Sequence, residues 1–258
     1  PGLICTMHSL AHRIVTESAD RLGLSEDLRV IRNDTTRDVL LGDAAQLAGF
    51  ERSGAKATKL CRQYGDCSPS DAKKCKICDH YRRVLGRCNA IDHDDQILLA
   101  CKVLREHRDI ANQHRSHAKH LLVDEYQDIN AGQFEFIALL SDGNREGLFV
   151  VGDDDQSIYS WRGGSPRFIR RFEDGFGDTA RVIPLLHSYR CHRNVLGAAY
   201  AVVKRHDAGR LIKGEFSFER ERGPSVKIHN VPSDKREAVV VQRIVQDAVP
   251  SKTALVLV

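Results

Sequence analysis

The sequence lacks the long apolar runs of a membrane protein. No hydrophobic stretch approaches the roughly 18 residues that a membrane-spanning helix requires, and the opening residues, PGLICTMHSL, carry no secretory signal pattern. The chain has 258 residues, of which 41% are apolar and 29% are charged, so it can form one large or two ordinary domains. We expect a cytoplasmic protein without membrane contact, whose net charge of +4 permits a polyanionic partner but does not require one.

The sequence also lacks a glycine-rich phosphate-binding loop of the form G-x-x-x-x-G-K-[ST]. That absence matters because the stretch 121-LLVDEYQDIN-130 has the pattern that accompanies such a loop, a buried strand that ends in Asp124, Glu125 and Asp128. Ligands gather at the carboxyl ends of parallel strands. In phosphate-loop nucleotide hydrolases, an acidic pair at this position holds magnesium and positions the attacking water. The alternative is a solvated strand end without chemistry.

Apolar positions follow strand and helix spacings in turn along the chain. They predict strands at 3–7, 121–123, within 147–156, and at 181–185, 225–230 and 253–258, and helices at about 10–22, 91–119, 131–141, 193–206 and 234–248. This alternation predicts an α/β fold with a parallel sheet and helices on both faces. Residues 24–90 are more polar and predict an inserted helical, cysteine-rich module, with one helix over 25–40.

A second acidic strand end, 152-GDDDQSIYSWRGG-164, combines a neutral amide with aromatic residues. Gln156 can contact a terminal phosphate without competing for a metal ion. Tyr159 and Trp161 beside Arg162 form a stacking platform for unpaired bases, although Trp161 could instead belong to the core. Further along, Tyr189 and Arg190 follow a predicted strand, where they can stack on a purine and approach a transferring phosphoryl group.

Five motifs in this order resemble the UvrD/Rep/PcrA group of superfamily-1 DNA helicases. They are TMHSL at 6–10, IDHDDQI at 91–97, LLVDEYQD at 121–128, VGDDDQSIYSWRGG at 151–164 and LLHSYRC at 185–191. The resemblance implies a RecA-like P-loop NTPase helicase fold that uses ATP and Mg²⁺. It also implies 3′ to 5′ movement on single-stranded DNA, binding to DNA junctions, and a place in DNA repair or recombination. It names no protein partner.

The resemblance assigns a role to each matching residue. Asp124 would hold Mg²⁺ and Glu125 would be the catalytic base, while Gln156 and Arg190 would contact the γ-phosphate and Tyr189 would stack on adenine. The residues expected on the DNA path are Thr6, His8, Tyr159, Trp161, Arg162 and, within 91–97, Asp95 or its neighbours. Ser188 stands where the family usually has asparagine, which puts a local hydrogen bond in doubt.

The resemblance also divides the chain into parts. Residues 1–23 and 91–180 would belong to the first RecA-like motor domain, 24–90 to an insertion, and 181–258 to the start of the second motor domain. The lysine-containing phosphate loop and the last motifs of the family would lie outside this sequence, so the fold is expected to be incomplete and the isolated chain inactive as an ATPase. Two alternatives remain open at this point: a non-catalytic DNA-binding module on a helicase fold, and the motor part of a helicase–nuclease.

Cysteines concentrate within the polar insertion. Cys61, Cys67, Cys75 and Cys78 have the spacing C-x5-C-x7-C-x2-C, in which a C-x2-C pair and a second pair can complete a tetrahedral zinc site. His80 or Cys88 could replace one ligand. The expected role of Zn²⁺ is structural, because a small polar module gains folding free energy from a metal. An iron–sulfur cluster and no metal at all are the alternatives.

Overall fold

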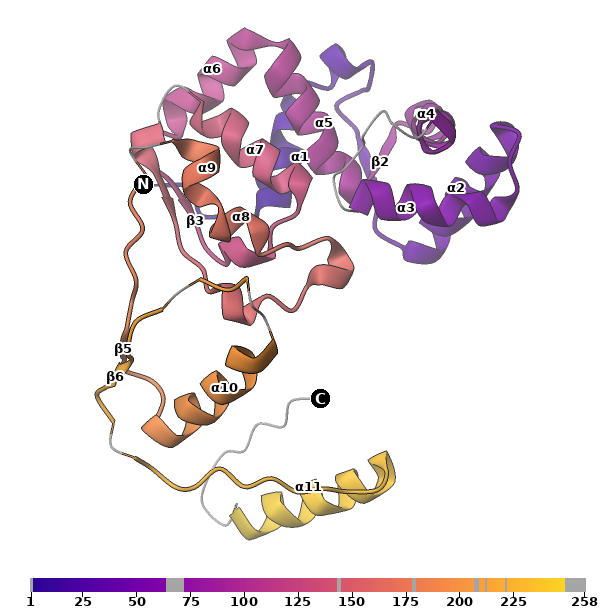
Figure 1. Ribbon diagram of the computed structural model, residues 1–258. Helices are drawn as coiled ribbons and strands as arrows, with labels where there is room; N and C mark the ends of the chain where they lie inside the picture. Colours follow the sequence, from indigo (N-terminus) through magenta and orange to yellow (C-terminus); the bar gives the residue numbers. More distant parts are fainter. Residues whose placement is uncertain are drawn as a thin grey trace. The chain divides into compact units, whose positions relative to one another are not determined.

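The computed structural model describes residues 2–63, 72–142, 145–177, 180–206, 209–211, 213–220 and 222–248 (Figure 1). Its contacts divide the chain into two compact units. The first consists of Pro1–Ile183 with Gly209–Ile212, and the second of Pro184–Ala208 with Lys213–Val258. Short parallel strands mix with helices in the described residues, as expected for an α/β protein. These strands form three two-stranded sheets, so the single continuous sheet that was predicted is not seen there.

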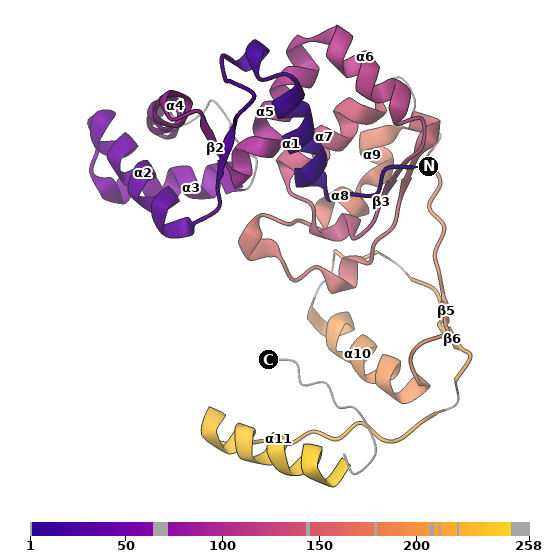
Figure 2. The same ribbon diagram turned by 180° about the vertical axis from the view of Figure 1, so that it is seen from behind.

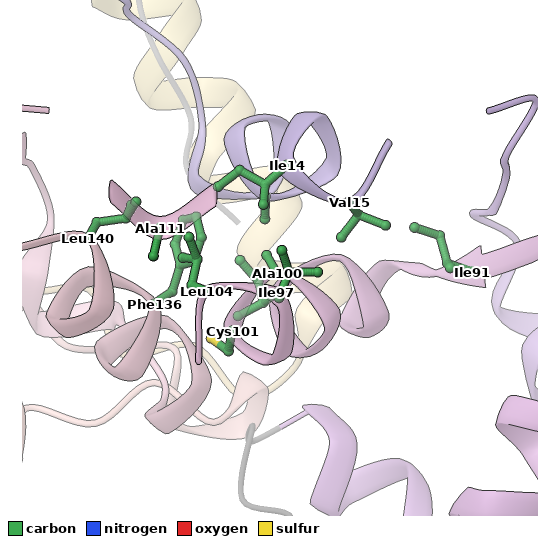
Figure 3. Packing of buried hydrophobic residues seen from close by; sticks show 12 residues of the cluster. Ile14, Val15, Ile91, Ile97, Ala100, Cys101, Leu104, Ala111, Phe136 and Leu140 are labelled. Atoms are coloured by element: carbon green, nitrogen blue, oxygen red, sulfur yellow. The ribbon is translucent and has the colours of Figure 1, made fainter. Parts of the chain in front are cut away.

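The body of the first unit is a layer of helices packed beside a parallel strand pair. The helices are α1 (Met7–Glu17), α5 (His93–Glu106), α6 (Arg108–His117) and α7 (Ala131–Ser141), and the strands are β3 (Leu121–Val123) and β4 (Leu148–Val150). Their apolar faces meet in one buried cluster that includes Ile14, Ile97, Leu104 and Phe136 (Figure 3). Leu121, at the start of β3, packs against this core, while Val123 and the β4 residues Leu148 and Val150 belong to a second cluster.

Side-chain caps determine where three of these helices begin. The hydroxyl of Thr6 accepts a hydrogen bond from the Ser9 N–H at the start of α1. Reciprocal capping boxes begin α5, at Asp92 and Asp95, and α7, at Asn130 and Gln133. Caps of this kind satisfy backbone donors that a helix start leaves unpaired. Polar residues at these positions therefore have a structural role in helix initiation.

Residues 32–89, here called the helical module, lie in sequence between the strands of a second parallel pair, β1 (Arg29–Ile31) and β2 (Ala90–Asp92). Between these strands lie α2 (Asp34–Leu47), α3 (Ala55–Gln63) and α4 (Ala72–Arg87), which gather to one side of β2 (Figure 2). The module has its own small core, formed chiefly by Leu41, Ile77, Tyr81 and Leu85. Pairing of β1 with β2 brings the beginning and the end of the module together.

A buried ion network joins the module to α5. Arg62 of α3 donates to Asp92 at 2.9 Å, and its guanidinium lies 2.7 Å from a carboxylate oxygen of Asp95. The Tyr81 hydroxyl donates to the other oxygen of Asp92 at 3.0 Å, and Arg62 also contacts the Cys78 sulfur at 3.3 Å. The side chains of Arg62, Asp92 and Asp95 are each at most 2% exposed. Buried charges are tolerated only when they are paired in this way.

The remaining elements of the first unit are short. They comprise the 3-10 helices η1 (Asp20–Leu22), η2 (Arg52–Gly54), η3 (Tyr126–Asp128), η4 (Arg145–Gly147), η5 (Asp154–Gln156) and η6 (Ser160–Arg162), and the helices α8 (Arg167–Arg170) and α9 (Phe172–Phe176). The aromatic rings of Phe168, Phe172 and Phe176 pack with the residues that follow β3 in a second cluster of this body. The cluster packs the short helices α8 and α9 against Val123, Tyr126 and Ile129, at the end of β3 and just beyond it.

The second unit contains a two-residue parallel pair, β5 (His187–Ser188) with β6 (Ser217–Phe218), and the helices α10 (Arg193–His206) and α11 (Asp234–Ala248). Both helices begin and end where the sequence pattern predicts. In neither unit do the described residues include a helix with the length and apolarity needed to cross a bilayer.

Several predicted strands are wrong. Residues 3–6 form no regular structure, and Leu3 and Ile4 are 62% and 98% exposed. Residues 181–185 and 225–230 are likewise irregular. A strand forms only where a neighbouring strand pairs with its backbone, and the described residues offer none at these three places. The prediction for 253–258 lies outside the described residues.

The helix predicted over 25–40 is also wrong in its first half. Residues 29–31 form β1, and the helix begins only at Asp34, after Asn33 as its cap. The helix predicted over 91–119 is interrupted as well, because β2 runs to Asp92 and His107 lies between α5 and α6 with an extended backbone. Tertiary pairing with a distant strand, which local spacing does not reveal, accounts for β1 and β2.

Candidate functional site

The two acidic strand ends lie side by side because β3 and β4 are parallel neighbours. Val123 is paired with Val150 in the register. Beyond the last strand residues, the Val151 N–H donates to the Val123 carbonyl at 2.8 Å and the Tyr126 N–H donates to the Val151 carbonyl at 2.9 Å. The residues that follow the two strands therefore leave the sheet at the same edge, where ligands of α/β proteins bind.

Gln127 connects these two ends. Its side-chain nitrogen donates to Glu125 at 2.7 Å and to Asp128 at 3.3 Å, and its side-chain oxygen accepts from the Asp153 N–H at 3.0 Å. Gln127 is 1% exposed, so these bonds form away from solvent and fix its position. Sequence reasoning missed Gln127, although an amide between Glu125 and Asp128 was a signal that could have indicated a bridging role.

Gly152 is required at this junction. A Cβ atom at this position would meet the Gln127 side-chain oxygen at 2.5 Å and the Ile169 side chain at 2.9 Å. Only glycine lets the end of β4 approach the bridging amide this closely. Substitution here would push Gln127 away from Glu125.

Glu125 has a strained backbone. Its φ is 52° and its ψ is 41°, in the left-handed region that residues other than glycine seldom occupy. Its N–H donates to the Asp124 carboxylate at 2.9 Å, and both acidic side chains belong to exposed residues. Strain of this kind persists where the surrounding structure fixes a functional conformation. The turn therefore presents two adjacent carboxylates to solvent with the Glu125 carboxylate held by Gln127.

The donor set at the end of β3 fits Mg²⁺. This hard ion prefers carboxylate and water oxygens, and it binds through one or two carboxylates. Asp124 offers an exposed carboxylate, and one oxygen of Asp128 is buried with no hydrogen-bond partner in the described part of the chain. Burial raises the pKa of Asp128, and the neighbouring charge of Glu125 raises it further. A cation would offset the repulsion between these acids.

Two of the three aspartates after β4 are paired with arginines of the protein itself. Ligand atoms of Asp153, Asp154 and Asp155 lie within 4.8 Å of one another. However, Arg170 donates to Asp154 at 2.9 Å, and Arg210 forms a two-point contact with Asp155. These arginines supply positive charge to Asp154 and Asp155. Asp153 in turn accepts from the Gln156 side chain at 2.8 Å.

Trp161 lies on the surface with its neighbours, so the alternative of a core tryptophan is excluded. Trp161 is 62% exposed, and its ring centroid lies 6.2 Å from that of Tyr159. The guanidinium of Arg162 lies 4.9 Å from the centroid of the Trp161 ring, in a cation–π contact. The structure thus brings together the three residues predicted to form a stacking platform.

Gly164 holds this platform against the acidic strand end. A Cβ atom on Gly164 would meet the Asp128 carbonyl oxygen at 2.8 Å and the Tyr159 carbonyl oxygen at 3.0 Å. The Ser165 N–H also donates to the Ile129 carbonyl at 3.1 Å. The backbone that carries Trp161 is therefore packed directly on the backbone that carries Asp128.

His8 stacks on His93, a neighbour of Asp95 within the motif 91–97. The rings of His8 and His93 lie 3.9 Å apart and are nearly parallel, at 9°. Burial lowers the pKa of His8 to about 4, and the neighbouring His93 contributes to this shift. Burial also lowers the pKa of His93, as do the charges of Arg37, Arg162 and Arg32. His93 lies within the motif 91–97 and directly follows β2, which the sequence pattern did not predict.

The prediction for 91–97 named Asp95 or its neighbours, and Asp95 itself is not accessible to DNA, whereas a contact by a neighbour stays a prediction. Asp95 is 2% exposed and its carboxylate is paired with Arg62. Of its neighbours in the same motif, His93 is the exposed one. Thr6, also predicted on the DNA path, is exposed, and its hydroxyl caps α1.

Tyr189 and Arg190 belong to the second unit and are both exposed. Tyr189 is 73% exposed, and its ring lies 4.4 Å from that of His187. The Ser188 hydroxyl accepts from the Cys191 N–H at 3.2 Å. Serine at this position therefore retains a local hydrogen bond across the turn that presents Tyr189 and Arg190.

The predicted cysteine site falls largely outside the described part of the chain. Cys67 lies outside the described residues, as do the side chains of Cys61 and Cys75. Cys78 is buried, 6% exposed, and faces Arg62. The zinc assignment therefore stays a prediction.

Comparison with known proteins confirms the family resemblance. Residues 2–177 match the family model of the UvrD/REP helicase N-terminal domain. The ATP-dependent DNA helicase PcrA of Staphylococcus epidermidis is 29% identical over 250 residues, which cover 92% of this chain and 34% of that protein. PcrA of Leuconostoc citreum is 28% identical over 249 residues, with 91% and 33% covered. The chain thus spans about a third of the length of these curated relatives. The match over most of its length shows that this chain belongs to the UvrD/REP helicase family.

Proposed function

We propose that this chain contributes the hydrolytic edge and part of the DNA path to an ATP-dependent DNA helicase. The observation that carries the proposal is the continuity of the site: Gln127 joins Glu125 to the end of β4, and Gly164 packs the Trp161 turn on the backbone of Asp128. A nucleotide site and a base-stacking platform that share one backbone junction can influence each other. That influence is what a motor driven by hydrolysis requires.

In the proposed reaction, ATP is the substrate and each residue of the first unit has a defined task. Asp124 would hold Mg²⁺, and the bound ion would neutralise charge at the phosphates. Glu125 orients the attacking water and accepts its proton, and Gln127 keeps the Glu125 carboxylate in place. Gln156 has a second amide hydrogen, beyond the one donated to Asp153, for an oxygen of the terminal phosphate.

Two residues of the second unit have proposed tasks toward the same substrate. Arg190 stabilises the charge that develops on the transferring phosphoryl group, and Tyr189 stacks on the adenine base. Their exposure in the unit is compatible with contacts to a ligand. No lysine-containing phosphate loop occurs in these 258 residues, so we expect negligible hydrolysis by the chain alone.

On the DNA side, Trp161, Tyr159 and Arg162 stack on unpaired bases, and Thr6 and His8 contact the strand beside α1. We propose movement from 3′ to 5′ on single-stranded DNA, with a role in repair or recombination. Unwinding of duplexes that carry either a 3′ or a 5′ single-stranded tail tests the direction directly. The full-length gene product should separate the 3′-tailed duplex when ATP is present, and separation of only the 5′-tailed duplex would refute the assigned polarity.

We further propose a structural Zn²⁺ ion in the inserted module, bound by Cys61, Cys67, Cys75 and Cys78. The supporting observation is their spacing in a module whose own core is small. Cys78 lies next to Arg62, and a guanidinium beside a thiolate stabilises its charge. Metal analysis of the purified protein should find about one zinc per chain.

A further inference from the structure

A short segment of the first unit lies, in sequence, between two stretches of the second unit. Gly209–Ile212 belongs to the first unit, whereas Pro184–Ala208 and Lys213–Val258, on either side in sequence, belong to the second. The described residues Gly209–Leu211, here called the return segment, lie against the acidic turn that follows β4. The return segment is therefore separated in sequence from the rest of the first unit, which ends at Ile183.

Polar contacts attach the return segment. The Nε of Arg210 donates to Asp155 at 2.8 Å, and its Nη2 contacts the other oxygen of the same carboxylate. The Leu211 N–H donates to Asp154 at 2.8 Å, and the same oxygen accepts from Arg170 at 2.9 Å. The side chains of Arg210 and Asp155 are only 12% and 14% exposed. Solvent screening, which makes surface ion pairs weak, is reduced at this degree of burial.

These contacts lie one residue away from Gln156. The N–H of Asp155 donates to Asp153 at 3.1 Å, and the side chain of Gln156 donates to the other oxygen of Asp153 at 2.8 Å. The Gln156 N–H also bonds to the Asp153 carbonyl at 2.9 Å. The contacts thus run from Arg210 to Asp155, from the Asp155 N–H to the Asp153 carboxylate, and from that carboxylate to the Gln156 side chain. The position of Gln156 therefore depends on Arg210.

We propose that Arg210 is a positioning residue for Gln156 and that the return segment transmits movement of the flanking stretches of chain to the nucleotide site. The proposal deepens the proposed function and rests on it, because Gln156 matters only if it contacts the terminal phosphate. A two-point arginine–carboxylate contact fixes both distance and orientation. When the return segment moves away, Asp155 loses its cation and the turn that carries Gln156 loosens. Hydrolysis then depends on whether the segment is attached.

Hydrogen exchange tests the attachment without reference to activity. In the full-length gene product, Arg210→Ala should raise amide exchange across 152–157 by about tenfold or more, because the local opening free energy falls by the loss of a charge-assisted pair. Asp155→Asn, which keeps the side-chain shape, should have the same effect. Arg52→Ala is the matched control, since it removes an exposed ion pair with Asp43 in the module and should leave 152–157 unchanged.

Kinetics then separate positioning from a merely structural role. Arg210→Ala should lower kcat for DNA-stimulated ATP hydrolysis by about 10- to 100-fold with little change in KM, since small misplacement of a positioned group has effects of this size. Arg210→Lys, which retains the charge, should recover most of this loss. Unchanged exchange at 152–157, or unchanged kcat in Arg210→Ala, would overturn the inference. A wild-type protein without DNA-stimulated hydrolysis would overturn the proposed function instead. The contact of Arg210 with Asp155 would then be tested by hydrogen exchange at 152–157 alone.

Discussion

Replacing Arg62 by alanine should strongly destabilise the helical module at neutral pH. Arg62 is the shared cation of two buried carboxylates, at 2.9 Å from Asp92 and 2.7 Å from Asp95. Its removal leaves both acids in an environment that water does not reach. Tyr81 can still donate to Asp92, but a hydroxyl does not neutralise a charge.

The expected loss is large relative to the stability of a domain. Breaking a buried ion pair by deleting one partner costs about 3–5 kcal/mol, and Arg62 serves two carboxylates, so we expect a value near the upper limit. A typical domain has a free energy of unfolding of about 5–15 kcal/mol. Arg52→Ala, which removes an ion pair whose side chains are 49% and 46% exposed, is the control and should cost at most about 1 kcal/mol.

The pH dependence of this loss follows from the environment of the two acids. Burial raises the pKa of Asp95, whereas at Asp92 the opposing influence of burial is outweighed by Arg62, the Asp95 N–H and Tyr81, which lower its pKa. Without Arg62, both carboxyl groups should take up protons more readily in the folded than in the unfolded state. The variant should therefore regain stability relative to wild type as the pH falls from 7 toward 5.

Urea unfolding followed by circular dichroism measures these differences directly. The wild type, Arg62→Ala and Arg52→Ala should be compared at pH 7 and pH 5. A loss of less than about 1 kcal/mol in Arg62→Ala at pH 7 would refute the account of a shared buried cation, because it would place this pair in the range of surface pairs.

Further predictions concern the site, the DNA path and the metal. Gln127→Leu should lower the free energy of unfolding by about 1–3 kcal/mol, because Glu125 and the Asp153 N–H lose a buried partner. Urea unfolding measures this loss, and an unchanged free energy of unfolding would contradict the bridging role of Gln127. Trp161→Ala should weaken binding of an oligo(dT) strand by about 1–3 kcal/mol while Trp161→Phe retains most of it; equal affinity of the alanine variant, measured by fluorescence anisotropy, would exclude base stacking. The lowered pKa of His8, about 4 instead of 6.5, gives stability that is present above pH 6.5 and is lost as the pH falls toward 4. Asp94, whose pKa burial raises to about 6, has the opposite effect, because its protonation stabilises the folded protein as the pH falls. Thermal unfolding of wild type and His8→Gln should therefore be compared from pH 7 to 4.5, where the difference between the two proteins gives the contribution of His8 alone. Zinc removal by a chelator should lower the helical signal of the module, and an unchanged spectrum in protein shown to contain no metal would end the zinc proposal.

Local sequence signals predicted those parts of the fold that depend on nearby residues. The boundaries of α7, α10 and α11 follow from apolar spacing at 3.6 residues. The acidic end of β3 was predictable because an apolar run ends in three carboxylates within eight residues, 121–128. Exposure of Trp161 also followed from its polar neighbours. These features need no knowledge of distant contacts.

The remaining features depend on partners far away in sequence. The pairing of β1 with β2 joins residues 29–31 to 90–92, and no local pattern specifies it. Asp95 occurs within a motif that suggested DNA contact, yet its carboxylate forms an ion pair with Arg62, 33 positions earlier in the chain. The bridge from Gln127 to Asp153 and the contact of Arg210 with Asp155 likewise require the folded chain. Side-chain pairing over such distances is a property of the tertiary structure alone.

The most direct test of the proposed function is ATP hydrolysis by the full-length gene product with and without single-stranded DNA. Wild type should hydrolyse ATP faster when DNA is present. Glu125→Gln, which keeps the shape of the side chain and its contact with Gln127 but removes the base, should lower kcat by about 10²- to 10⁴-fold and should still bind DNA. Hydrolysis by Glu125→Gln at the wild-type rate, or a wild type that does not respond to DNA, would contradict the assignment of this edge as the hydrolytic site of a DNA motor.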